Sequence, residues 1–81
     1  MSIENTEIVT LDLRNMPAPQ RHPLIFSTFE SLPVGHILKL VNDHDPKPLY
    51  YQFLYERKDT FEWNYQQEGP VDWEVDIKKV K

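Results

Sequence analysis

The sequence predicts an α+β fold, a two-layer α/β sandwich with the element order β-α-β-α-β-β and a four-stranded mixed sheet. Between residues 61 and 78, two runs alternate large apolar residues with polar ones, which is typical of a hairpin with one buried face. Each of two earlier strand-like runs is followed by a segment in which apolar residues recur three or four positions apart, as expected for a strand followed by a helix. Because the alternate hairpin residues are mostly charged or polar, we expect both helices to cover the opposite face of the sheet.

The first strand is expected from Glu7 to Arg14. This stretch is rich in β-branched residues, and Val9, Leu11 and Leu13 alternate with polar residues. Residues 15–23 hold three prolines and show no periodicity, so they predict a stiff loop.

A short helix is predicted from Leu24 to Leu32, preceded by Pro23, which suits a first helical turn. The side chains at its apolar face recur at spacings of four and three. The segment Pro33-Val34-Gly35 ends this helix, with Gly35 at a positive φ. The apolar face consists of Ile25, Phe29 and Leu32.

An inner strand is predicted from His36 to Val41, because its residues are apolar on both faces. Asp45 is then expected to cap a second helix, and Pro46 to occupy the first helical position. This helix ends at a turn over residues 57–60. Its apolar face is expected to contain Leu49, Phe53 and either Leu54 or Arg57.

The last two predicted strands give the clearest pattern in the chain. They are joined by Glu68-Gly69-Pro70. We expect Trp63 and Trp73 to lie in the core, on the inner face of this hairpin. The first two strands, which are connected through a helix, should be parallel and joined by a right-handed crossover. The predicted inward residues are Phe61, Trp63 and Tyr65 in one strand, and Val71, Trp73, Val75 and Ile77 in the other.

Length and composition limit the classes of function. The 81 residues predict one domain over residues 1–81, with residues 1–6 disordered. The net charge of -4 and the scattered basic residues argue against nucleic acid as a partner. We find no apolar run of membrane-spanning length and no signal-peptide pattern, so we expect no membrane partner. The chain has no cysteine, which excludes thiol chemistry within it and favours a cytoplasmic location. We expect a monomer without a cofactor.

The start of the chain resembles the small sulfur-carrier family called TusA or SirA-like. Leu11-Asp12-Leu13-Arg14 matches the opening motif of that family, and Val34-Gly35 and Asn42-Asp43-His44-Asp45-Pro46 match two later features. The family carries its persulfide sulfur on a cysteine of a Cys-Pro pair. Ala18-Pro19 or His22-Pro23 stands at that place here. The resemblance therefore implies the fold and does not imply sulfur carriage.

A longer resemblance covers nearly the whole chain. Arg21-His22-Pro23-Leu24-Ile25-Phe26, the segment from Asn42 to Leu49, and Glu68-Gly69-Pro70 with Trp73 are similar to a bacterial family known as domain of unknown function 2249. That family is grouped with the sulfur-carrier fold. The resemblance implies no reaction, although some members occur beside haemerythrin-like or nitrogen-oxide-handling proteins.

The segment from Asn42 to Leu49 is also the best candidate for a site, because it holds more ionisable residues than a turn requires. Ligands of α/β layers bind beyond the carboxyl ends of parallel strands, and helix N-termini there favour anions. The alternative is that Asp45 only caps a helix and that His44 is a solvated turn residue. We predict a polar rim that binds a small anion or a partner protein, made of Arg14, Arg21, His22, Asp43, His44, Asp45 and Lys47.

Metal binding and catalysis have weaker support. No pair of histidines has a dedicated metal-ligand spacing, and His36 should lie at the opposite end of its strand from His44. No nucleophile stands out, so we assign no catalytic residue and no metal ligand. The function we favour is a non-enzymatic binding or accessory module that is not a sulfur carrier. The alternative is a metal-dependent or redox accessory protein, or a weak enzyme, that uses His22 and His44.

The second predicted helix carries three tyrosines along its length, Tyr50, Tyr51 and Tyr55. One helix face cannot bury all of them together with Phe53. They form either an exposed docking surface or a cover over the edge of the sheet, and the sequence leaves both interpretations open.

Overall fold

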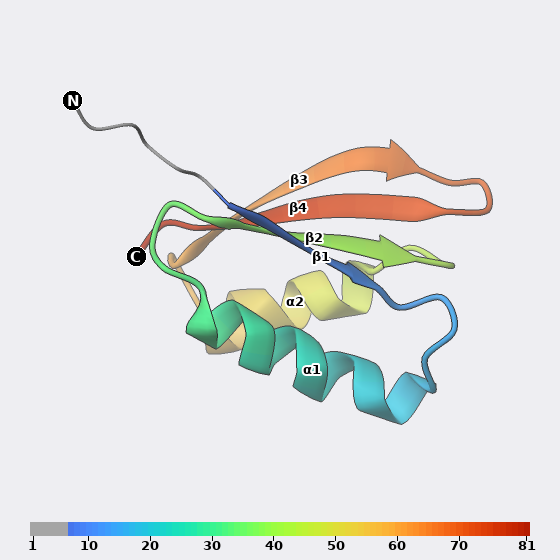
Figure 1. Ribbon diagram of the computed structural model, residues 1–81, viewed down its shortest axis with the longest axis horizontal. Helices are drawn as coiled ribbons and strands as arrows, with labels where there is room; N and C mark the ends of the chain where they lie inside the picture. The colour runs from blue at the N-terminus through green and yellow to red at the C-terminus, as the bar shows by residue number, and fades with distance from the viewer. Residues whose placement is uncertain (1–6) are drawn as a thin grey trace.

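The computed structural model describes residues 7–81, and the expected disorder of residues 1–6 lies outside this range. Its elements follow the predicted order (Figure 1). They are β1 (Ile8–Asp12), α1 (Ala18–Ser31), β2 (Ile37–Asn42), α2 (Lys47–Glu56), β3 (Phe61–Glu68) and β4 (Trp73–Lys79).

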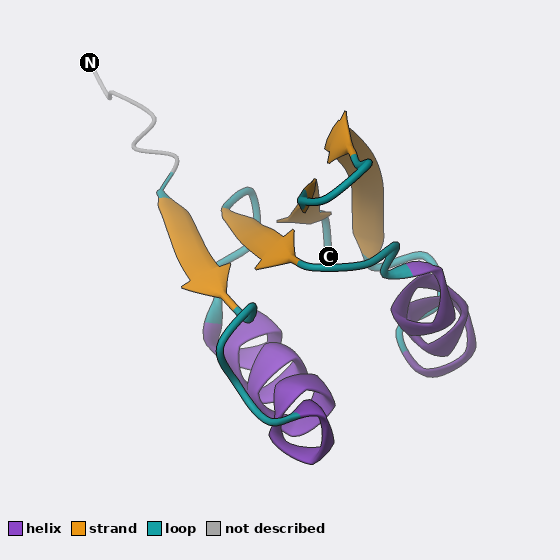
Figure 2. Cartoon of the chain, turned by 90° about the vertical axis from the view of Figure 1, so that its right-hand side faces the viewer, coloured by secondary structure: helices purple, strands orange, loops and turns teal. Residues whose placement is uncertain are grey.

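The four strands form one mixed sheet with the order β1-β2-β4-β3. β1 and β2 are parallel, whereas β4 is antiparallel to both β2 and β3. Both helices lie on the same side of the sheet, α1 below the β1 and β2 side and α2 below the other (Figures 1 and 2). The predicted two-layer α+β architecture is therefore confirmed.

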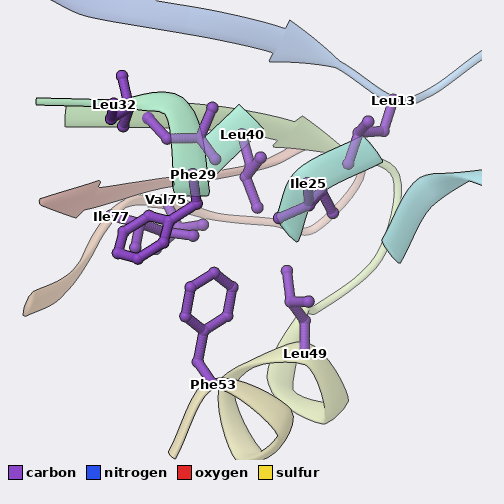
Figure 3. Packing of buried hydrophobic residues seen from close by; sticks show 10 residues of the cluster. Leu13, Ile25, Phe29, Leu32, Leu40, Leu49, Phe53, Val75 and Ile77 are labelled. Carbon is purple, nitrogen blue, oxygen red and sulfur yellow. The ribbon is translucent and has the colours of Figure 1, made fainter. Parts of the chain in front are cut away.

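The core lies between the sheet and the two helices. Phe53 of α2 packs at its centre, with its ring centroid 5.1 Å from that of Phe29 and 4.6 Å from that of Phe26. Figure 3 shows Phe53 and Leu49 pointing from α2 toward the sheet residues. Burial of each such side chain stabilises the fold by roughly 1.5–3 kcal/mol. The buried apolar residues are Leu13, Ile25, Phe29, Leu32, Leu38, Leu40, Leu49, Phe53, Val75 and Ile77.

The first helix begins at Ala18, so the predicted loop over residues 15–23 is wrong from 18 onward. Proline has a φ close to the helical value, and Pro19 lies in the first turn, where no N–H is needed. Pro23 lies inside the helix on an exposed position, where it removes one backbone hydrogen bond. Arg21 reinforces the same turn, since its Nε donates to the Met16 carbonyl at 2.8 Å.

The predicted start of the second helix is also wrong. α2 begins at Lys47, its N-cap position is Pro46, and no side chain caps it. The Asp45 carboxylate instead accepts a hydrogen bond of 2.8 Å from the Tyr65 hydroxyl, which joins this turn to β3. At the other end of α2, Leu54 is exposed, whereas the Arg57 guanidinium lies 5.3 Å from the Phe26 ring centroid. Arg57 therefore extends the packed face of the helix.

The hairpin differs from the prediction at its turn and in the burial of its tryptophans. β3 continues to Glu68 with an irregularity between Tyr65 and Gln67. Gly69 has a φ of 74°, and a Cβ there would lie 2.9 Å from the Trp73 ring. Val71 was predicted to face inward, but it lies in the turn and is exposed.

Trp63 and Trp73 are only partly buried, although both were expected in the core. β3 is an edge strand of the sheet, and among residues 7–81 it is α2 that covers its inner face. Trp63 packs against the core with one side and leaves the other side accessible.

Candidate functional site

The carboxyl ends of the parallel strands β1 and β2 lie at the same edge of the sheet, as predicted for the polar rim. Their register pairs Asp12 with Val41, so the residues that follow each strand are neighbours. The first turns of α1 and α2 lie at this same end of the molecule (Figure 1). Each sequence-predicted site residue can therefore be placed relative to this end.

Arg21 is fixed by a network of acceptors. Its Nη1 donates to Asn42 Oδ1 at 2.8 Å and to Asp43 Oδ1 at 3.0 Å, while its side chain is only 12% exposed. Asn42 is itself buried and donates to the His44 carbonyl at 3.2 Å. Hydrogen bonds from Arg21 and, secondarily, from His44 lower the pKa of Asp43 to about 2. The network joins α1 to the turn after β2.

His22 and His44 each have one ring nitrogen held by an oxygen. His44 Nδ1 lies 2.7 Å from Asp43 Oδ1, and His22 Nδ1 lies 2.9 Å from Gln52 Oε1. The Gln52 amide nitrogen donates to Glu56, so the amide oxygen is the atom that faces His22. In a neutral imidazole, Nδ1 is therefore the donor and Nε2 carries the lone pair. In this tautomer each histidine has Nε2 as an acceptor, and neither Nε2 is hydrogen-bonded to another residue of 7–81.

Arg21, His22 and His44 border the same small cavity, which has a volume of about 80 Å³. Its other walls are mostly apolar and come from β2, from both helices, and from the segments that follow β1 and precede α2. A water molecule occupies roughly 30 Å³ of liquid, so the cavity holds a few waters or one small ion. The apolar lining residues are Leu13, Ala18, Ile25, Leu40, Pro46, Pro48 and Leu49, and Asn42 is the remaining polar one.

Arg14 does not line this cavity. Its guanidinium binds Asp12, with Nη2 2.6 Å from Oδ2, and also lies 3.4 Å from Asp72 Oδ1. The hydrogen bonds from Arg14 lower the pKa of Asp12 to about 2. Arg14 therefore belongs to a separate exposed ion-pair cluster, which ties the end of β1 to the hairpin turn.

Asp45 and Lys47 also do not line the small cavity. Asp45 binds the Tyr65 hydroxyl, and burial, followed by this contact, raises the pKa of Tyr65. Lys47 lines a second and larger hollow, which the sequence did not predict as a site. Of the seven predicted rim residues, the structure brings together Arg21, His22, Asp43 and His44.

The larger hollow is an aromatic groove between α2 and β3, with a volume of about 500 Å³. The rings of Tyr50 and Trp63, which both line the groove, pack edge to face with their centroids 5.2 Å apart. The signal for it in the sequence was the tyrosine run on the helix, but Tyr55 is 89% exposed and lies outside the groove. The groove is lined by Lys47, Tyr50, Tyr51, Leu54, Asp59, Phe61, Trp63 and Tyr65.

The serines of α1 lie outside both hollows. The hydroxyls of Ser27 and Ser31 donate to carbonyls of their own helix, to Leu24 at 3.5 Å and to Thr28 at 2.9 Å. Within residues 7–81 no three His, Asp or Glu side chains are grouped as metal ligands. No helix among the described residues is long and apolar enough to cross a membrane.

Comparison with known families agrees with the longer resemblance. The family described as uncharacterized conserved protein (DUF2249) matches residues 10–79, and the chain therefore belongs to this family. No curated protein and no solved structure matches the chain.

Proposed function

We propose that this domain is a non-enzymatic binding module that engages a partner protein through the aromatic groove. The observation that carries the proposal is the groove itself, which is lined on both sides by aromatic rings. Tyrosine and tryptophan are enriched where proteins bind each other, because they combine large apolar area with a polar tip. Tyr51 and Leu54 are 59% and 41% exposed, so this apolar surface is accessible.

Between the two ligands expected from the sequence, the charges favour a partner protein over a small anion. Arg14 and Arg21 are each paired with carboxylates. A free anion at the rim would have to displace Asp43 from Arg21, whose Nη1 already donates to Asn42 and to Asp43. As part of this proposal the module is a cytoplasmic bacterial monomer of the TusA-like fold group, and it does not carry sulfur.

The proposal is tested by site-specific photo-cross-linking in the native cells. A photoreactive phenylalanine replaces Tyr51, which lines the groove, or Tyr55, which lies on the same helix outside it. We expect a small set of discrete cross-linked proteins from position 51 that is absent from position 55. The same set should weaken when Lys47→Glu is added. Identical products from both positions, or none from position 51, would contradict the proposal.

A second candidate function, a metal-dependent or redox accessory protein, is supported by the free Nε2 atoms of His22 and His44. A histidine whose Nδ1–H is held by a carboxylate or amide oxygen is a typical arrangement of metal ligands. Titration of Zn²⁺ or Ni²⁺, followed through the imidazole NMR signals, should shift His22 and His44 together. His36 lies at the other end of β2, where its Nδ1 contacts the Glu7 amide, and it is the internal control. Independent shifts of the two rings would rule out a shared site.

A further inference from the structure

The aromatic groove lies beside an unpaired strand edge. β3 is the terminal strand of the sheet and pairs only with β4 among the described residues. Every second residue of such a strand presents its N–H and C=O groups outward, ready to pair with another chain. A strand added there would lie about 4.8 Å from β3, and alternate side chains would point to the side of the sheet that α2 covers. Those side chains would enter the groove.

The two ends of the groove carry opposite charges. α2 and β3 run in opposite directions, and the bond between Asp45 and Tyr65 places the start of α2 near the end of β3. Lys47 therefore lies at the Tyr65 end of the groove, and Asp59 lies at the Phe61 end. This polarity gives an occupant a preferred direction.

We propose that the occupant of the groove is an extended segment of the partner protein, which pairs antiparallel with β3 as a fifth strand. This inference rests on the proposed function. Antiparallel pairs outnumber parallel ones two- to threefold, and recognition by strand addition takes affinity from backbone bonds and specificity from side-chain pockets. Such a segment starts with an acidic residue at Lys47, continues with apolar residues at alternate positions, and ends with a basic residue at Asp59.

A second copy of this chain fits the same edge less well. β3 contains Glu62 and Glu68 and no lysine or arginine, so pairing of two β3 strands brings together edges of like charge. The chain as a whole carries a net charge of -4, which adds to that repulsion. A foreign segment with a basic end avoids both effects.

The probe is a phage-displayed library of random peptides of about ten residues, the length of a long strand. Selection on the whole chain should enrich sequences with an acidic residue, then alternating apolar residues, then a basic residue. A synthetic copy of the most enriched peptide should shift the backbone amide signals of 61–68 in NMR spectra. N-methylation of one alternate set of its amides should abolish binding, whereas methylation of the other set should leave binding largely intact.

Charge variants test the direction of the peptide. Lys47→Glu should weaken binding of the selected peptide about two- to fivefold, as expected for one exposed ion pair, and should improve binding of its charge-reversed version. Asp59→Asn removes the opposite charge and keeps a residue that tolerates the φ of 64° at this position. Lys81→Glu, an equal charge change at an exposed position outside the groove, should have little effect.

Each outcome decides the inference. No enrichment, a helical spacing of the apolar residues, or amide shifts that spare 61–68 would overturn it. Concentration-dependent dimerisation with shifts at β3 would identify a second copy as the occupant and overturn it as well. If cross-linking at position 51 succeeds while the peptides fail, the partner-binding function stands and only the strand-addition mode falls.

Discussion

The hydrogen bond between Tyr65 and Asp45 can be measured as a coupling free energy. Tyr65→Phe removes the hydroxyl and keeps the ring in the groove, and Asp45→Ala removes the acceptor. If Asp45 were a helix cap, as its place in the sequence suggested, Tyr65→Phe would leave the cap intact and the two changes would be additive. Because the hydroxyl binds the carboxylate at 2.8 Å, we expect them to be non-additive.

Hydrogen bonds to charged groups contribute about 1.5–3 kcal/mol, and both residues are partly solvated, so the expected coupling is roughly 1.5 kcal/mol. For a domain of this size, Tyr65→Phe alone should then lower the melting temperature by about 6–12 °C. Urea denaturation of the wild type, both single variants and the double variant gives the coupling directly. A coupling below roughly 0.5 kcal/mol would refute the structural role assigned to Asp45.

The pH dependence supplies an independent check on the same contact. The pKa of Tyr65 is raised in the folded state, first by burial and then by Asp45. The protonated phenol therefore contributes its full stabilisation below the pKa that tyrosine has in the unfolded chain, about 10. This contribution to the unfolding free energy is lost as the pH rises above that value. The unfolding free energy of the wild type should fall more steeply above pH 10 than that of Tyr65→Phe. Equal slopes would contradict the assignment.

Four further outcomes are expected. His44→Ala should lower the unfolding free energy by less than about 0.5 kcal/mol in chemical denaturation, because the side chain is 63% exposed and its hydrogen bond goes to the exposed carboxylate of Asp43. The Asp43 carboxyl should titrate near pH 2 by NMR, so that its stabilising contact is present above the ordinary pKa and lost as the pH falls toward 2; Arg21→Met should return the midpoint toward the usual value. Phe53→Ala should cost about 3–5 kcal/mol in the same denaturation assay, and a loss under 1 kcal/mol would contradict its central place in the core. Incubation with a cysteine desulfurase and labelled cysteine should leave the mass of the chain unchanged, because it has no thiol to hold a persulfide.

The element order was predictable because alternation and helical spacing are local properties of the sequence. The start of α1 was not, because prolines were interpreted as loop residues. In α1 the fixed φ of Pro19 agrees with a helix, and the contact from Arg21 to the Met16 carbonyl stabilises the first turn. The cost of Pro23 is one backbone bond on an exposed side. Local side-chain contacts of this kind do not appear in the spacing of apolar residues.

The groove was only partly predictable, because the tyrosine run left a docking surface open but did not indicate the contribution of β3. Alternation shows that Phe61, Trp63 and Tyr65 share a face, but it does not show where their strand lies in the sheet. In the order β1-β2-β4-β3 the strand is terminal, so its inner face is covered on one side only. In an inner position the same three rings would have been buried, as their alternation predicted. The accessibility of Trp63 is thus a consequence of strand order.

Strand order also explains why the turn after β2 holds so many polar residues. Its successive residues serve different neighbours: His44 borders the small cavity beside α1, Asp45 holds the hydroxyl of β3, and Lys47 lies in the aromatic groove. Pro46 is buried between them. Because β4 separates β2 from β3 in the sheet, this turn and α2 are the connection between the centre of the sheet and its free edge. A single turn rich in polar residues can therefore contribute to two hollows. The composition of the turn alone could not show that the two hollows are separate.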